Sequence, residues 1–129
     1  MSKEKKILFV AHHRLDRSPG QRYRFEQYFS YLNSNGFSCE LANIISEKDD
    51  QILYNSYNYL KKGIIALNAY RKRYLNYRNI KEYDLIVLYR EAVLTRSILF
   101  EKLFSNSGVP LVFDFDDAIW IKDVSNVNR

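Results

Sequence analysis

The segment from Val109 to Ile121, VPLVFDFDDAIWI, constrains the fold more than any other part of the chain. Its first five residues are almost entirely apolar, which is typical of a strand buried on both faces of a parallel sheet. Three carboxylates, Asp114, Asp116 and Asp117, follow at once. In an open α/β sheet, ligands bind beyond the carboxyl ends of the strands. Because three neighbouring acids cannot all be buried without partners, we expect them to face water, cations or a ligand.

Similar apolar runs alternate with helical patterns along the rest of the chain. Strands are predicted at residues 6–11, 37–45, 84–89 and 109–113. Helices are predicted at residues 18–35, 60–78 and 95–106. This alternation implies right-handed crossovers and an α/β fold with a Rossmann-like, doubly wound parallel sheet. The predicted strand order across the sheet is 37–45, 6–11, 84–89, 109–113.

The first predicted helix has signals at both ends. Ser18 precedes Pro19, and Gln21 follows three residues after Ser18, a pattern that predicts an N-terminal capping box. The pair Asn35-Gly36 is typical of the left-handed turn that ends a helix. An apolar stripe at helical spacing is predicted to pack on the sheet: Tyr23, Phe25, Tyr28, Phe29 and Leu32.

Length and composition fit one domain over residues 1–129, with 47% hydrophobic residues. Cys39 is the only cysteine, which excludes an internal disulfide and fits a reducing compartment. The first apolar run, residues 7–11, is too short for a signal peptide or a membrane span. We therefore expect a cytoplasmic protein. The formal net charge of +5 favours an anionic partner.

Four arginines surround the predicted start of the first helix: Arg14, Arg17, Arg22 and Arg24. Cations are disfavoured at a helix N-terminus, because its free N–H groups already carry positive potential. An anion bound between the arginines would explain why they gather there. Alternatively, Arg22 pairs with Glu26 and the other arginines are solvated. The spacing is not G-x-G-x-x-G, so the usual dinucleotide-binding fingerprint is absent.

Charged or titratable residues also follow two other strands. His12 and His13 come after the first strand, and Arg90 and Glu91 end the third. All four are expected at the same sheet edge as the acids. One histidine is expected to be only a loop residue while the other could face a ligand, and an ion pair of Arg90 and Glu91, with each other or across loops, explains them as simply as ligand contact does. No Cys/His spacing suggests zinc. Because charged residues follow three of the four predicted strands, we expect a ligand-binding site at this edge of the sheet.

The acidic cluster allows several interpretations. The D-x-D pair could hold a divalent metal with a nucleotide diphosphate. The sequence FDFDD is similar to the first motif of haloacid dehalogenase-type phosphatases, with Asp114 as nucleophile and Asp116 as acid/base, although Ala118 replaces the usual Thr. The acids could also line a sugar-binding or catalytic cleft. A purely structural alternative is that they cap a following helix or pair with Arg90.

Residues 51–81 contain seven Lys or Arg, six Tyr, and no Asp or Glu. A stripe at helical spacing is predicted to pack on the sheet: Leu60, Ile64, Leu67, Tyr70 or Arg71, Tyr74 and Tyr77. The basic residues then form a solvated face or contact an anionic membrane surface. A single-stranded nucleic acid is an alternative partner, since stacking aromatics and cations suit it. No RNP, KH or helix-turn-helix signature supports it, and we expect no nucleic acid.

Three segments together resemble the N-terminal domain of bacterial family 4 glycosyltransferases with the GT-B fold: residues 5–37, 83–91 and 108–120. The matching features are the S-P-x-x-R-x-R helix entry, the L-x-x-x-G-F helix end, D-L-I before an Arg, and V-P-h-V-h-D-h-D-D. The resemblance implies transfer of a sugar from a nucleotide-sugar donor to a saccharide or lipid-linked acceptor in surface polysaccharide synthesis. It also implies a retaining reaction that needs no metal or other cofactor.

The resemblance assigns roles to particular residues. The donor phosphates would be framed by Arg14, Arg17, Ser18, Gly20, Arg22 and Arg24. The acceptor cleft would be lined by His12, His13, Arg90 and Glu91, with Asp114, Asp116 and Asp117 as catalytic residues. Many relatives have His-Asp where this chain has Asp116-Asp117. Their main donor site lies in a C-terminal domain with a pair of glutamates, so this chain is expected to be the N-terminal half of a longer enzyme and inactive alone. The basic, Tyr-rich residues 51–81 favour a peripheral position at the inner face of the cell membrane, next to a lipid-linked acceptor.

Overall fold

A computed structural model describes residues 3–54 and 58–117 of the chain. Its elements in chain order are β1 (Lys5–Val10), α1 (Pro19–Arg24), η1 (Glu26–Tyr28), α2 (Phe29–Ser34), β2 (Phe37–Ala42), α3 (Glu47–Tyr54), α4 (Tyr59–Arg78), η2 (Ile80–Glu82), β3 (Leu85–Tyr89), α5 (Leu99–Ser105) and β4 (Leu111–Asp114). Tyr57 of the basic segment and the end of VPLVFDFDDAIWI, from Ala118, lie outside the described residues.

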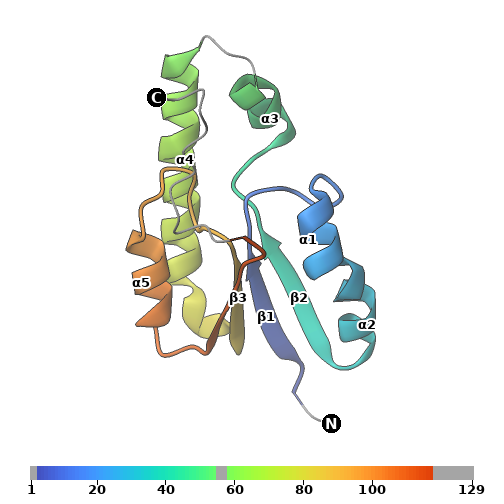
Figure 1. Cartoon of the computed structure of the whole chain (residues 1–129). Helices are drawn as coiled ribbons and strands as arrows, with labels where there is room; N and C mark the ends of the chain where they lie inside the picture. The colour runs from blue at the N-terminus through green and yellow to red at the C-terminus, as the bar shows by residue number, and fades with distance from the viewer. Residues whose placement is uncertain (1–2, 55–57, 118–129) are drawn as a thin grey trace.

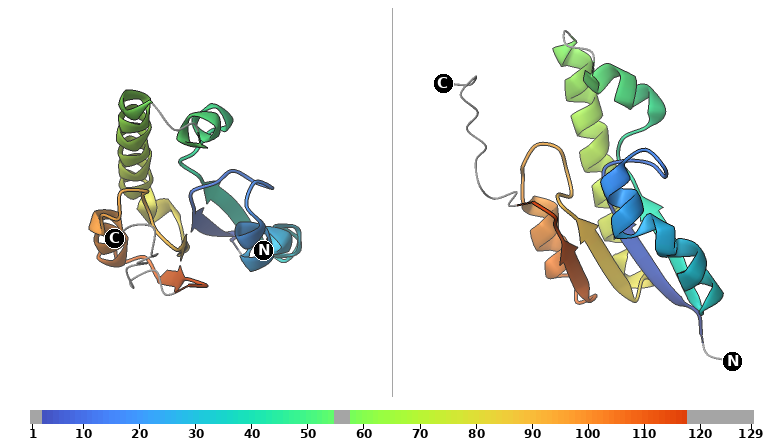
Figure 2. Two further views of the ribbon diagram at one scale, coloured as in Figure 1. Left: turned by 45° about the horizontal axis from the view of Figure 1, so that its top comes forward. Right: turned by 45° about the vertical axis from the view of Figure 1, so that its right-hand side comes forward.

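The four strands form one all-parallel sheet in the order β2-β1-β3-β4, which confirms the predicted order. Ile7 of β1 is in register with Cys39 of β2 on one side and with Leu85 of β3 on the other. Helices α1 and α2 cover one face of the sheet, and α4 and α5 cover the other (Figures 1 and 2). The architecture is therefore α/β and Rossmann-like, with the doubly wound arrangement that the sequence predicts.

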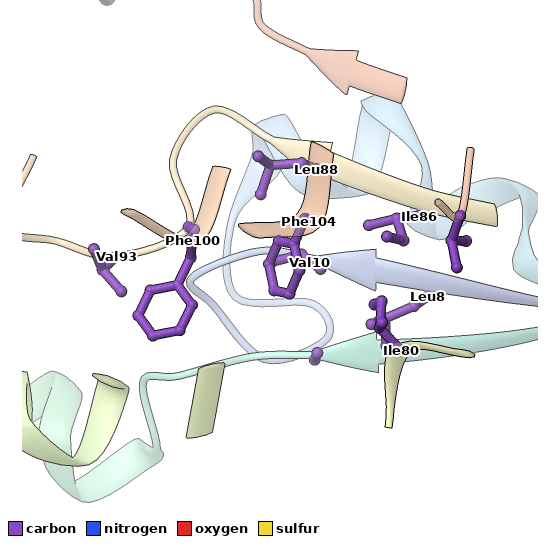
Figure 3. Close-up of a cluster of buried hydrophobic side chains, with 11 residues drawn as sticks. Leu8, Val10, Ile80, Ile86, Leu88, Val93, Phe100 and Phe104 are labelled. Atoms are coloured by element: carbon purple, nitrogen blue, oxygen red, sulfur yellow. The ribbon is translucent and has the colours of Figure 1, made fainter. Parts of the chain in front are cut away.

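Successive residues of β1 face opposite sides of the sheet, as the pleat requires. One core, shown in Figure 3, includes Leu8, Val10, Ile86 and Leu88 of the strands and Phe100 and Phe104 of α5. On the opposite face, Ile7 and Phe9 pack with Phe25 and Tyr89. At the carboxyl ends of β1 and β3, Val10 and Leu88 belong to the first core, and Ala11 and Tyr89 belong to the second.

The predicted helix over residues 18–35 is interrupted. α1 ends at Arg24, and Phe25 has φ −150° and ψ −36°, outside the helical region. The ring of Phe25 is buried, with its centroid 5.1 Å from that of Phe9, so packing holds this residue in a non-helical conformation. Because α1 is then only six residues long, its dipole is weak, and its N-terminus is less suited to bind an anion than the predicted longer helix would be.

The inner face of this segment is narrower than predicted. Phe25, Phe29 and Leu32, at positions i, i+4 and i+7, pack in the core as expected. Tyr23 and Tyr28 are exposed, which corrects the prediction. Tyr23 lies two residues from Phe25, a step that places a helical side chain on the far side. Gly36 has φ +86°, as the helix-ending signal predicts.

The start of α1 lies where it was predicted, but the capping box does not form, because neither of its two side-chain hydrogen bonds is present. Ser18 is the N-cap of α1 and Pro19 begins the helix, as predicted, but no side-chain hydrogen bond caps it. The side chain of Gln21 is buried and points instead to the loop after β1. Its Nε2 donates to the His13 carbonyl, and its Oε1 accepts from the His13 N–H, both at 2.9 Å. Gln21 therefore fixes the loop that carries the histidines.

Helix α4 confirms the predicted helix over residues 60–78, but the predicted inner face is only partly right: Tyr70 and Tyr77 pack against the core, whereas the other predicted members do not. Ile65, Ala69 and Arg73, each four residues apart, are the buried positions. Leu60 and Leu67, predicted to be inward, are 78% and 72% exposed. The fully buried guanidinium of Arg73 donates to three backbone carbonyls at 2.6–2.8 Å and so fixes the rotation of the helix.

Strand β4 is not buried on both faces as predicted, since Val112 and Phe113 are 48% and 43% exposed. The reason is its place at the edge of the sheet, where α5 reaches Leu111 but the helices leave the following residues uncovered. Among the described residues, no helix combines the length and the apolar character needed to cross a membrane.

Candidate functional site

A polar pocket of about 260 Å³ lies at the carboxyl ends of β1 and β3. Its lining comes from the ends of both strands and the start of α1: His12, His13, Ser18, Gln21, Tyr89, Arg90 and Glu91. The crossover from β1 leads to β2 on one side, and the later crossover leads to β3 on the other. The pocket therefore lies at the switch point of the sheet, where open α/β folds bind ligands.

The loop that carries the two histidines is held from two sides. Gln21 binds both backbone groups of His13, as described above. The carbonyl of His12 accepts hydrogen bonds from the N–H groups of Ile44 and Ile45, at 3.1 and 3.0 Å. The sequence predicted His12 and His13 at this edge, and the structure brings them into one pocket with Arg90 and Glu91.

Both imidazoles are neutral at pH 7. Burial, with the nearby Arg73 as the next cause, lowers the pKa of His12 to about 4. Burial also lowers the pKa of His13. His12 Nε2 and His13 Nδ1 are buried, and neither has a hydrogen-bond partner among the residues that the structure describes. Such orphaned ring nitrogens are costly unless a ligand or water satisfies them, so they indicate where a bound polar group would make contact.

Tyr89 and Gln21 are pocket residues that the sequence analysis missed as such. The sequence predicts Tyr89 only as the last residue of a strand and Gln21 only as part of a helix cap. The Tyr89 hydroxyl donates to Asp116 at 3.3 Å and lies so close to Gly20 that a Cβ at that position would be 2.5 Å from it. Gly20 is thus explained by close packing with Tyr89, a reason that does not require a phosphate.

Arg90 is the cation of the pocket. It has φ +63°, the left-handed conformation that non-glycine residues adopt rarely, and its N–H donates to the Asp114 carbonyl at 2.8 Å. Its guanidinium lies 3.7 Å from Asp116 and 3.3 Å from Asp117. The pairing of the acids with Arg90, left open as the structural alternative, is therefore present for these two carboxylates.

The four arginines of the first loop do not surround one point. Arg14 and Arg17 both bind the buried carboxylate of Asp50 in α3, and Arg17, followed by Arg14, lowers the pKa of that group. Arg22 has its ion pair with Asp16, at 3.9 Å, and not with Glu26 as the structural alternative supposed. The anion between Arg14 and Arg17 is thus a side chain of the same chain, which the sequence could not place because Asp50 is 33 residues from Arg17.

Arg24 binds both carboxylate oxygens of Asp114 and so joins α1 to the end of β4. The three predicted catalytic acids therefore divide between two cations, Arg24 and Arg90. The described residues contain no group of three His, Cys, Asp or Glu placed to hold a metal ion, so the geometry lends no support to the D-x-D metal interpretation.

The arrangement favours an anionic or hydroxyl-rich ligand. One cation, two neutral imidazoles and two hydroxyl side chains converge on the pocket, and Glu91 adds an acceptor.

Comparisons with models of protein families, with curated proteins and with solved structures found no match.

Proposed function

We propose that this chain is the acceptor-side, N-terminal domain of a glycosyltransferase that takes a sugar from a nucleotide-sugar donor. The supporting observation is the polar pocket at the switch point between β1 and β3. The residues that the glycosyltransferase resemblance assigns to the cleft, His12, His13, Arg90 and Glu91, line this pocket together. A second domain would supply most contacts to the nucleoside.

Arg90 carries the main chemical role in this proposal. Negative charge accumulates on the departing diphosphate during sugar transfer, and a guanidinium already placed in the pocket would stabilise it electrostatically. Asp116 and Asp117 would exchange their contact with Arg90 for hydrogen bonds from acceptor hydroxyls. The neutral imidazoles of His12 and His13 would bind sugar hydroxyls through the ring nitrogens that have no partner in the described chain.

The first loop contributes less to binding of the donor phosphates than the resemblance implies. Arg14 and Arg17 would reach a donor phosphate only by leaving Asp50. In line with the resemblance, we extend the proposal to a retaining, metal-independent reaction on a saccharide or lipid-linked acceptor in surface polysaccharide synthesis.

The test is an NMR titration of the isotopically labelled chain with pyrophosphate and with uridine and guanosine diphosphate sugars. Pyrophosphate should shift the amide signals of His12, His13 and Arg90 with millimolar affinity. Arg90→Gln should abolish these shifts, and Arg90→Lys should keep part of them because it retains the charge. Lys102→Gln, an exposed cation on α5 outside the pocket, is the matched control and should leave the titration unchanged.

Two results would contradict the proposal. Micromolar affinity of this chain alone for a nucleotide-sugar would mean that the donor site is misassigned. Magnesium-dependent release of phosphate from an aryl phosphate would establish the phosphatase alternative, in which Asp114 is the nucleophile. In the structure Arg24 holds both oxygens of that carboxylate, an arrangement that does not favour nucleophilic attack.

A further inference from the structure

The outer side of α4 carries an apolar stripe that no described element covers. Because Arg73 fixes the rotation of the helix, most of the stripe predicted for the core points to solvent, although Tyr70 and Tyr77 do pack against the core. Its exposed members are Leu60, Ile64, Leu67, Tyr74 and Leu75. Leu60, Ile64 and Leu67 are three or four residues apart, and Tyr74 and Leu75 come two turns after Leu67, so all five follow one side of the helix.

The position of α4 leaves this side open along its length. The helix has 20 residues, about 30 Å, and its first turns extend beyond the carboxyl ends of the strands (Figure 1 and the right view of Figure 2). Its opposite side is already occupied, since Ile65 and Ala69 are buried and Arg73 is bound to backbone carbonyls. The outer stripe therefore cannot join the core of this domain without losing those contacts.

Cations accompany the stripe without compensating acids. Lys61, Arg71 and Arg78 are exposed on α4, and none of them forms a salt bridge with a residue that the structure describes. Asp49 lines a groove that Arg71 also lines, but its carboxylate accepts from the Ser46 N–H at 3.0 Å. Residues 51–81 contain no Asp or Glu. The surface is thus both apolar and positive.

We propose that the outer face of α4, defined by Leu60, Ile64, Leu67, Arg71, Tyr74 and Arg78, binds an anionic lipid membrane with the helix lying flat on it. The aliphatic side chains enter the headgroup boundary, and the long arginine side chains extend to lipid phosphates. The exposed ring of Tyr74 suits that boundary, with an apolar body and a polar hydroxyl.

Two other occupants fit this surface less well. A second copy of the chain, packed face to face, would bring Arg71 and Arg78 against the same cations of its partner. A single-stranded nucleic acid would use cations and stacking rings, but Leu60, Ile64 and Leu67 offer no planar surface for bases. An anionic membrane offers phosphates to the cations and an apolar layer to the aliphatic side chains. This inference does not depend on the proposed sugar transfer, since it rests on a different surface.

The experiment is vesicle flotation of the whole chain across a salt series, with phosphatidylcholine vesicles and with vesicles that also contain phosphatidylglycerol. The chain should bind only the anionic vesicles, and less as salt rises. Arg71→Gln with Arg78→Gln should weaken the partition coefficient by roughly 30-fold. Leu60→Gln with Leu67→Gln should weaken it at least tenfold. All four positions are exposed, so both variants should keep the circular dichroism and melting temperature of the parent.

A matched control separates this face from net charge alone. Lys3→Gln with Lys102→Gln removes two exposed cations elsewhere and should change partition less than threefold. Equal losses in this control and in the arginine variant would overturn the proposal, as would absence of binding to anionic vesicles at low salt. Concentration-dependent dimers abolished by Leu60→Gln with Leu67→Gln, or salt-dependent oligonucleotide binding, each without vesicle binding, would assign the face to a different partner and overturn it.

Discussion

The guanidinium of Arg73 is fully buried and donates to the carbonyls of Ala11, Ala42 and Ala92. Burial lowers the pKa of Arg73 to about 9, which still leaves the side chain charged at neutral pH. A buried cation is tolerated only when its donors are satisfied, and here backbone acceptors satisfy them. The buried carbonyls of Ala11 and Ala92 depend on Arg73 in turn, whereas that of Ala42, at the end of β2, also accepts from the Ala11 N–H at 3.3 Å.

Replacing Arg73 by Met should therefore destabilise the domain strongly. The apolar side chain fills much of the space but leaves buried carbonyls without donors, at a cost of about 3 kcal/mol or more in the free energy of unfolding. Arg71→Met, two residues earlier and exposed, is the control and should change it by less than about 0.5 kcal/mol. Urea unfolding measures both, and an Arg73→Met variant as stable as the Arg71→Met variant would refute this account.

At the scale of elements, the candidate site depends on how the loop after β1 is attached to α1. Gln21 makes that attachment with one donor and one acceptor of its amide, both directed to the backbone of His13. An amide is required, because the His13 N–H needs an acceptor and its carbonyl needs a donor. The side chain is buried, so water cannot replace either bond.

Gln21→Glu should lower the free energy of unfolding by about 1–3 kcal/mol, because the carboxylate cannot donate to the His13 carbonyl. Gln27→Glu is the matched control: Gln27 also donates to a backbone carbonyl, that of Tyr23, but it is exposed and should cost less than about 0.5 kcal/mol. Thermal and urea unfolding of the two variants give the comparison. Equal effects would mean that the buried amide does not fix the loop.

At the scale of the whole molecule, the strand order could be predicted because it depends on local patterns and on general rules of chain crossover. The rotation of α4 could not, since the inward position of Arg73 depends on carbonyls from three distant segments. The strand-end residues of the pocket were predictable for the same reason as the strands. The pairing of Arg14 and Arg17 with Asp50 was not, because no local pattern relates the first loop to α3.

Stability of the whole domain should fall as the pH drops from about 6.5 to about 4. The pKa of His12 is lowered to about 4 from its ordinary 6.5, so in this range the unfolded chain binds a proton that the folded chain does not. Above pH 6.5 both states are neutral at this position and the effect vanishes. The lowered pKa of His13 acts in the same direction.

His12→Gln should reduce the loss of stability between pH 7.5 and pH 4.5 by on the order of 2 kcal/mol. Urea midpoints at the two pH values, for the parent and the variant, measure this difference. Asp50 does not interfere with this comparison, because Arg17 and Arg14 lower its pKa, so its contribution to stability is lost only at still lower pH. An unchanged pH dependence in His12→Gln would show that His12 titrates normally.

The contacts of Arg73 also have a consequence for the rates of folding and unfolding. Its acceptors extend from Ala11 to Ala92, so they can be engaged only after β1, β2 and the segment that follows β3 have assembled. Contacts that form after the transition state slow unfolding and leave the folding rate nearly unchanged. The buried Arg73 should therefore mainly slow unfolding, so that it lengthens the lifetime of the native domain more than it speeds folding.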